Sequence, residues 1–318
     1  MATILVIAET REGAPTPLTR ELLGVARTIG DAVVALLIAP DERAAPDLIA
    51  HGAERVYHVH TESEDYEGEV WLPAVERVAR DIPPIAVLAG HTPSGADLAP
   101  RLAFRLESSV ATGCVAVAVE AGKLLFTRPC YGGNVRETVS FGHAPAVATV
   151  KAGVGVAAAD ATREGRVIVV DVPQIKPRVR VIERERDTAR AKNLEEAKII
   201  VAGGRGLEGP EGFRVLEDFA RVLDAAVGSS RVPCDLGWCP HSWQIGLTGK
   251  TVTPDLYFAV GISGAGHHMA GCGNARTIVA INSDPDAAIF RDARFGVVGD
   301  YRQVVPALTA AVMALKNK

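Results

Sequence analysis

The chain has 318 residues, of which 48% are hydrophobic and 23% charged, and its formal net charge is −4. This length allows about two domains, and the composition excludes an intrinsically disordered chain. The negative charge excludes a generally basic nucleic-acid-binding protein.

Five cysteines, an odd and scattered number, do not form the pattern of a disulfide framework. No apolar run reaches the roughly 18–20 residues of a membrane-spanning helix. The N-terminus lacks the charged region of a signal peptide. We therefore expect a cytoplasmic protein with reduced thiols and no integral membrane segment.

Short apolar runs alternate with amphipathic segments in the first third of the chain. The runs are apolar throughout, which is typical of parallel strands buried on both faces. This alternation predicts βαβ units. Strands are expected at 4–8, 32–39, 55–60 and 85–90, and helices at 19–29, 70–80 and 95–106.

The pattern changes after Ser109, where glycine-rich turns separate short strands without a strong helix between them. We expect these strands to extend the first sheet or to add antiparallel strands to it. The mixed-charge segment 173–192 is expected to be a solvated linker or an edge strand. Strands are expected at 115–119, 124–127, 138–140, 146–149 and 167–172.

A second alternation begins at Ala197 and predicts a second α/β domain. The chain is therefore expected to hold an N-terminal α/β domain at 1–190 and a Rossmann-like domain at 193–318, each a mostly parallel sheet with flanking helices. In the second domain, strands are expected at 198–202, 255–260, 277–282 and 296–298, and helices at 213–225 and 304–316.

Three turns of the second domain, at 203–206, 261–266 and 282–285, follow predicted strands. Open α/β sheets bind ligands at the carboxyl ends of their strands. Glycines there let backbone N–H groups approach an anion, which favours a phosphate-bearing ligand, although tight structural turns explain many such glycines. The segment 228–231 adds two hydroxyls and a guanidinium, or is only a helix C-cap with a surface arginine.

Three other known motifs are present only in incomplete form. The segment 244–250 ends like a P-loop but has Gln244 at the position of the first glycine. A nucleophile elbow at 261–265 fails at Ala265. The residues Cys234, Cys239, His241 and Cys272 lack the paired spacing of a zinc knuckle. We predict no metal and no catalytic acid–base residues.

The segment 201–306 resembles the flavin domain of electron transfer flavoprotein alpha subunits, and the first domain agrees more loosely through 95–101. The order and spacing of the matching runs are very specific. These runs are Gly203-Gly204-Arg205-Gly206, Gly228-Ser229-Ser230-Arg231, Gln244-Ile245-Gly246, Thr248-Gly249-Lys250, Pro254-Asp255-Leu256-Tyr257, Gly261-Ile262-Ser263-Gly264, His268-Met269-Ala270-Gly271, Ala280-Ile281-Asn282, Asp284-Pro285 and Gly299-Asp300.

The resemblance implies a heterodimer with an electron transfer flavoprotein beta subunit, which the N-terminal domain contacts, and FAD in the second domain. It places Arg231 over the isoalloxazine ring, Thr248 at flavin N5 and His268 at flavin O2. Ser230, Gln244, Ser263, Asn282 and Asp300 would hold chiefly the pyrophosphate and the adenosine part. The full set of implied cofactor-binding residues is Arg205, Ser230, Arg231, Gln244, Gly246, Thr248, Gly249, Gly261, Ser263, Gly264, His268, Asn282 and Asp300.

A flavin that gains electrons builds negative charge around N1 and O2, so a guanidinium and an imidazole N–H aimed there favour the reduced cofactor. The chain departs from the usual family pattern at Ala96, Leu247, Gly266-His267 and Cys272. Because the last three lie in cofactor loops, we expect them to alter the flavin potential or the choice of partner.

The expected function is that of an electron carrier rather than a substrate-converting enzyme. It would take electrons from a flavin dehydrogenase, such as an acyl-CoA dehydrogenase of fatty acid β-oxidation, and pass them to a downstream acceptor. One alternative is a subunit of an electron-bifurcating flavoprotein that uses NADH. A stand-alone nicotinamide dehydrogenase and a nucleotide-binding regulatory module are the others.

Overall fold

A computed structural model describes residues 2–131, 135–173, 178–179, 194–195 and 197–316. The chain divides into two compact units, one formed by residues 1–130 and 135–184 and the other by residues 131–134 and 185–318. We refer to them as the N-terminal and C-terminal units and describe each by itself. Most of the predicted linker at 173–192 lies outside the described residues.

The N-terminal unit is built on a seven-stranded sheet in which every neighbouring pair is parallel. All eight residues of β4 are buried, which explains why this strand reads as an unbroken apolar run. The strand order is β12-β5-β4-β1-β6-β11-β7. The strands are β1 (Thr3–Ala8), β4 (Ala32–Ala39), β5 (Arg55–His60), β6 (Ala86–Gly90), β7 (Val110–Cys114), β11 (Ala146–Val150) and β12 (Arg166–Val169).

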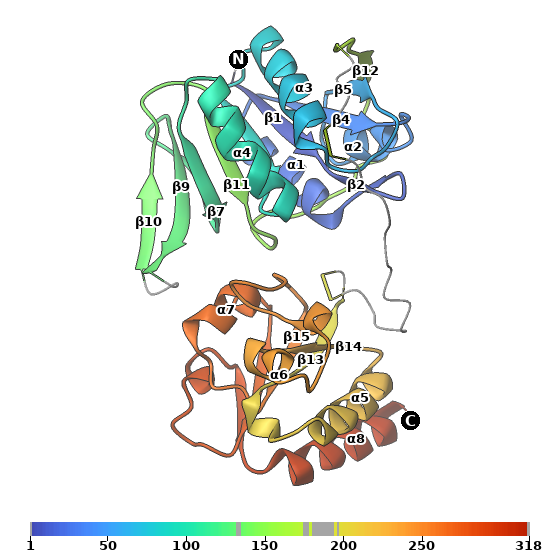
Figure 1. Ribbon diagram of the computed structural model, residues 1–318, viewed down its shortest axis with the longest axis vertical. Coiled ribbons are helices and arrows are strands. Elements are labelled where there is room, and N and C mark those ends of the chain that lie inside the picture. Colours follow the sequence, from blue (N-terminus) through green and yellow to red (C-terminus); the bar gives the residue numbers. More distant parts are fainter. Residues whose placement is uncertain (1, 132–134, 174–177, 180–193, 196, 317–318) are drawn as a thin grey trace. The chain divides into compact units, whose positions relative to one another are not determined.

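Helices cover both faces of this sheet (Figure 1). Alternate residues of β1 point to opposite faces, so that Ile4 packs with α1 and α2, whereas Leu5 packs with α3 and α4. Thr16 and Thr92 cap α1 and α4, because each side-chain oxygen accepts from a backbone N–H three residues later. The helices are α1 (Pro17–Ile29), α2 (Ala45–Ala50), α3 (Gly68–Asp81) and α4 (Pro93–Arg105).

The region after Ser109 extends the first sheet with three parallel strands, β7, β11 and β12, and β7 was not predicted. The antiparallel strands do not join that sheet. They form a separate three-stranded sheet, in which β9 lies between β8 and β10. Its strands are β8 (Ala116–Glu120), β9 (Lys123–Cys130) and β10 (Val135–Val139), and a short hairpin elsewhere pairs β2 (Thr10–Arg11) with β3 (Ala14–Pro15).

The C-terminal unit contains a five-stranded parallel sheet in the order β14-β13-β15-β16-β17. Counted within the unit, this is the doubly wound order 2-1-3-4-5, which confirms the predicted α/β class of this domain. The order reverses between β13 and β15. The strands are β13 (Ile199–Gly203), β14 (Ala226–Ser229), β15 (Leu256–Val260), β16 (Ile278–Asn282) and β17 (Phe295–Val298).

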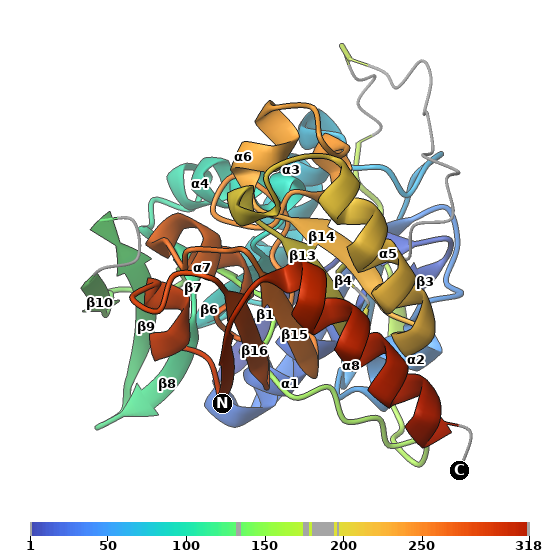
Figure 2. The ribbon, with the colours of Figure 1, turned by 90° about the horizontal axis from the view of Figure 1, so that it is seen from below.

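Two long helices, α5 (Glu211–Leu223) and α8 (Tyr301–Lys316), lie side by side on one face of this sheet (Figure 2). Phe213, Leu216 and Phe219 of α5 pack there against Phe258 of β15. The other face is packed by residues of α7 (Gly266–Cys272) and the 3₁₀ helix at Ala288–Arg291. Neither α7 nor the short helix α6 (Arg231–Asp235) was predicted.

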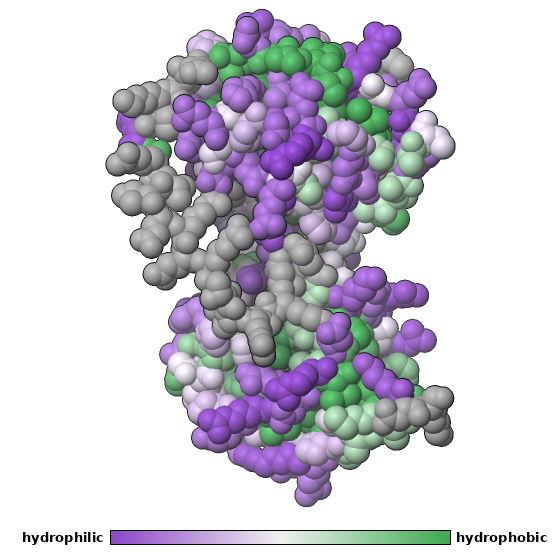
Figure 3. All heavy atoms as spheres, turned by 90° about the vertical axis from the view of Figure 1, so that its right-hand side faces the viewer, coloured by the Kyte–Doolittle hydropathy of each residue, from purple (hydrophilic) through white to green (hydrophobic). Residues whose placement is uncertain are grey.

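The faces of both units drawn in Figure 3 carry mainly hydrophilic side chains with smaller apolar areas between them. Within the described ranges, no helix combines the length and the apolar character needed to cross a membrane.

Candidate functional site

A cleft of about 1060 Å³ opens at the carboxyl edge of the sheet in the C-terminal unit. Its lining comes from the loops that follow β13, β14, β15 and β16, together with the loop 244–248. Ligand pockets in proteins commonly measure about 300–1,000 Å³. The cleft is therefore large enough for a dinucleotide cofactor, and it lies where the strand order reverses.

Two glycine turns cross on the floor of the cleft. Gly204 N donates to Val260 O and Gly206 N donates to Gly261 O, at 2.9 and 3.0 Å. A Cβ atom on Gly204 would lie 2.2 Å from Gly261 O, and Gly261 has a φ of +62°. Both turns therefore need glycine, because a side chain would force the two backbones apart.

Ten of the thirteen predicted cofactor-binding residues line this cleft. They come from five separate segments of the chain, which the parallel sheet brings to one edge. The ten are Arg205, Ser230, Arg231, Gln244, Gly246, Thr248, Gly261, Ser263, His268 and Asn282.

Gly249, Gly264 and Asp300 are not among the lining residues. The two glycines shape the loops instead, because a Cβ on Gly249 would lie 2.5 Å from Gln244 O and one on Gly264 would lie 2.2 Å from Ile289 N. Asp300 precedes α8, and its carboxylate accepts from Arg302 N at 2.8 Å.

Ser230 and Arg231 directly follow β14, so the segment 228–231 is a strand end rather than a helix C-cap. Ser230 N donates to Gly203 O, which ties this strand end to the first glycine turn. The Arg231 guanidinium pairs with the Asp235 carboxylate at 3.0 Å, and its side chain remains 65% exposed. This guanidinium is therefore a cation available to a ligand in the cleft.

The loop 244–250 presents polar groups beside apolar ones. Gln244 Nε2 donates to the Thr248 hydroxyl at 3.0 Å, which fixes the amide and the hydroxyl relative to each other. Gly246 has a φ of +147°, a conformation that side chains disfavour. Leu247 exposes about half of its side chain.

His268 is buried at the start of α7, and both of its ring nitrogens already have protein partners. Nδ1 lies 3.0 Å from Ile245 O, and Nε2 lies 2.9 Å from the Tyr257 hydroxyl. Because a carbonyl only accepts, the proton belongs on Nδ1, and Nε2 accepts from Tyr257. Burial lowers the pKa of His268 to about 4, so the ring is neutral at pH 7. The imidazole N–H therefore points to Ile245 O, and the charge in the cleft comes from other residues.

Asn282, at the end of β16, connects two loops of the cleft. Its side-chain nitrogen donates to Ile262 O at 2.9 Å, and its side-chain oxygen accepts from Asp284 N at 3.0 Å. The amide thereby holds the end of β16 against the loop that follows β15.

Sequence reasoning missed the apolar wall of the cleft and two of its acids. Val232, Leu236 and Trp238 form one wall, and Glu208 and Asp284 are the acids. Asp284 lies in the predicted turn at 282–285 without having been assigned to the site, whereas the other four follow no motif. A flat aromatic ring system fits against such a wall, whereas phosphates fit the glycine turns and hydroxyls.

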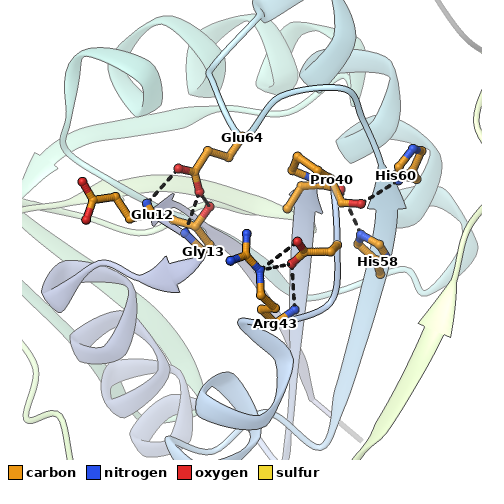
Figure 4. Close-up of polar contacts among 10 residues, drawn as sticks. Glu12, Gly13, Pro40, Arg43, His58, His60 and Glu64 are labelled. Carbon is orange, nitrogen blue, oxygen red and sulfur yellow. Dashed lines mark hydrogen bonds and ion pairs between the residues drawn. The ribbon is translucent and has the colours of Figure 1, made fainter.

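The N-terminal unit holds a second, much smaller cavity of about 150 Å³. Figure 4 shows the polar contacts of Glu64 and Arg43 at this cavity. Its polar groups are already paired with one another. The Glu64 carboxylate accepts from the backbone N–H groups of Glu12 and Gly13, and Arg43 pairs with Asp41. This cavity is too small for a dinucleotide, so the cleft of the C-terminal unit is the candidate site.

Comparisons with known proteins agree with this geometry. The family model "Electron transfer flavoprotein domain" matches residues 4–175, and the model "Electron transfer flavoprotein FAD-binding domain" matches residues 193–273. The chain is 41% identical to an electron transfer flavoprotein subunit alpha from Thermoanaerobacterium thermosaccharolyticum, with 98% of each chain covered. It is also 41% identical to the corresponding subunit from Bacillus subtilis, with 96% of each covered. A protein FixB from Clostridium saccharobutylicum is 37% identical, with 96% of this chain and 95% of the relative covered.

Proposed function

The chain belongs to the alpha subunits of the electron transfer flavoprotein family, with FAD as its cofactor, and we propose that it carries electrons as one half of a heterodimer. In this proposal a beta subunit completes the protein and contacts the N-terminal domain. The donor is a flavin dehydrogenase of the acyl-CoA dehydrogenase type, and electrons leave to a downstream acceptor. The five free cysteines favour a cytoplasmic location for the protein.

The observation that carries the proposal is the cleft at the reversal of strand order. It combines a floor of crossing glycine turns, an apolar wall and an exposed arginine. A dinucleotide with one flat ring system needs these three features together.

We assign the residues of the cleft by the chemistry that each brings. Arg231 supplies the positive charge for the flavin ring, and Thr248 supplies the hydroxyl for N5. Ser230, Gln244, Ser263 and Asn282 bring hydrogen-bonding groups for the pyrophosphate and adenosine part. The glycine turns at 204–206 and 261–264 lack side chains that would keep the phosphates away from the backbone. Asp300, Gly249 and Gly264 act through the shape of the loops.

Bound FAD supplies the redox chemistry, since its ring accepts and returns electrons one or two at a time. The protein's part is electrostatic. The guanidinium of Arg231 stabilises negative charge on the reduced ring, and the apolar wall limits access of water. The neutral His268 keeps the loop at Ile245 in place through its Nδ1–H bond.

The alternatives differ in what the purified protein holds. A bifurcating complex carries a second FAD in its beta subunit and uses NADH. A nicotinamide dehydrogenase oxidises NADH as a single chain, and a regulatory module binds adenine nucleotide without flavin colour.

Native mass spectrometry of the untagged protein from its own cells tests the proposal. We expect a heterodimer with one FAD and one AMP. A second FAD in place of AMP would favour bifurcation. A lone chain without flavin, from cells that contain the beta subunit, would contradict the proposal.

A further inference from the structure

Two cysteines of the C-terminal unit lie in contact beside the cleft. The sulfur of Cys234, in α6, is 3.5 Å from the sulfur of Cys239. Both residues are largely buried, with exposed fractions of 2% and 9%. A disulfide bond is about 2.05 Å long, so the sulfurs need to approach by roughly 1.5 Å to form one.

We propose that Cys234 and Cys239 are a redox modification site, at which hydrogen peroxide converts the dithiol to a disulfide and thereby reshapes the wall of the cleft. The site is a property of this pair of thiols and goes beyond the proposed electron transfer. Its effect on FAD rests on the proposed function.

The two thiols differ in a way that suits this reaction. The contact with the Cys239 thiol lowers the pKa of Cys234 below that of a free thiol, and the Ser229 hydroxyl makes a smaller contribution in the same direction. The same contact, together with burial, raises the pKa of Cys239. Cys234 is therefore the more readily ionised of the two thiols, and the thiolate is the nucleophile.

The reaction balances with hydrogen peroxide as the oxidant. The Cys234 thiolate attacks one peroxide oxygen, the O–O bond breaks, and the products are a sulfenic acid and hydroxide. The Cys239 sulfur then attacks the Cys234 sulfur, the S–O bond breaks, and water leaves with the Cys239 proton. The hydroxide takes up the proton that Cys234 had released, so two thiols and one peroxide yield one disulfide and two waters.

The connecting loop can absorb the movement. Gly237 lies between the two cysteines with a φ of +70°, and no atom lies within 4 Å of the place where its Cβ would be. Its neighbours Leu236 and Trp238 both line the cleft. Drawing the sulfurs together therefore displaces side chains that form the apolar wall.

The other three cysteines lack a neighbouring thiol. Burial raises the pKa of Cys114 and of Cys272 to about 12, so both remain protonated. Cys130 contacts the Glu137 carboxylate on the antiparallel sheet. All five cysteines lie in the described part of the chain, and Cys234 and Cys239 are the two whose sulfurs touch.

The sequence offers a direct readout of the modification. Trypsin releases the peptide 232–250, which holds both cysteines and no other. The purified flavoprotein complex is treated with hydrogen peroxide and then alkylated and digested. We expect this peptide to lose two hydrogen atoms, to escape alkylation, and to regain two alkylation sites after dithiothreitol. A peptide that stays fully alkylated, or one that gains oxygen atoms instead, would overturn the proposal.

The effect on the cleft is measured on the same samples as FAD affinity. We expect the peroxide-treated complex to bind FAD about tenfold more weakly and dithiothreitol to restore the affinity. Cys239→Ser should abolish the change, whereas Cys130→Ser should retain it. If the disulfide forms and the FAD affinity is unchanged, the disulfide does not reshape the wall of the cleft. An untreated complex without FAD would contradict the proposed function alone, since the peptide reports on the thiols independently.

Discussion

The hydroxyl oxygen of Tyr257 lies 2.9 Å from Nε2 of His268, and both residues are buried in the C-terminal unit. Tyr257 stands on β15 and His268 on α7, so this hydrogen bond joins the sheet to the helix that packs on it. The ring continues the connection through Nδ1 to Ile245 O, in the loop that lines the cleft. The pair is thus a buried polar link between the core and the candidate flavin site.

Tyr257→Phe keeps the ring but removes the donor to Nε2. An unpaired buried acceptor costs about 1–3 kcal/mol, so we expect the free energy of unfolding to fall by that amount. Urea unfolding followed by tryptophan fluorescence measures it, because Trp238 and Trp243 lie in this unit. Tyr57→Phe, in the N-terminal unit, is the matched control. Equal stability of the two variants would contradict the role of the hydrogen bond.

The pair also predicts a loss of stability in acid. Burial lowers the pKa of His268 to about 4, against 6.5 for a free histidine. Below pH 6.5, His268 is protonated in the unfolded chain but still neutral in the folded chain. The free energy of unfolding therefore decreases as the pH falls toward 4. Between pH 7.5 and 4.5 this amounts to about 2 to 3 kcal/mol.

His268→Gln isolates this contribution, since glutamine binds no proton in that range. The difference in unfolding free energy between the wild type and His268→Gln should shrink by the same amount over the two pH values. A difference that does not change with pH would show that His268 titrates normally.

Arg231→Gln removes the exposed cation of the cleft. Reduced flavin then loses a stabilising charge, and we expect the two-electron midpoint potential to become more negative by roughly 30 mV. Spectroelectrochemical titration of the complex measures it. Arg221→Gln, an exposed arginine of α5 paired with Asp218, should leave the potential unchanged. Equal midpoint potentials for Arg231→Gln and the wild type would show that Arg231 does not stabilise the reduced flavin ring.

Leu247→Gln places a polar residue at a position where the chain departs from the expected family pattern. Because Leu247 lines the cleft and is about half exposed, the new amide would add a hydrogen-bond donor to the cleft that holds FAD. We expect the potential to become more positive by about 30 mV. Leu247→Met, which stays apolar, is the control. If Leu247→Gln has the potential of the wild type, this position does not tune the cofactor.

Gly204→Ala tests the crossing of the two turns. Its Cβ would lie 2.2 Å from Gly261 O, and backbone cannot yield as a flexible side chain does. We expect a loss of about 3 kcal/mol in unfolding free energy and weaker FAD binding. Gly142→Ala, where no atom lies within 4 Å of the new Cβ, should have little effect. Normal FAD binding by Gly204→Ala would show that the turns tolerate separation.

The sequence predicted the long helices and strands well, because the apolar pattern that predicts each of them lies within its own residues. Residues 55–60 form β5 with the predicted bounds, and 32–39 form β4. The missed elements are short. Ala226–Ser229 contains no apolar run and is a strand only because it pairs with β13. Likewise α6 has five residues, too few to show a period.

The glycine turns and polar residues of the candidate site could be predicted, because each can be recognised from a short stretch of sequence. The sequence by itself determined that two parallel α/β folds follow one another and that the second has glycine-rich turns at its strand ends, because strand burial and turn conformation depend on neighbouring residues. Only the tertiary structure decided that His268 is neutral and engaged by Tyr257, that Gly204 crosses Gly261, and that the Cys234 and Cys239 sulfurs touch. These are distances between side chains and backbones that packing sets, and no spacing along the chain specifies them.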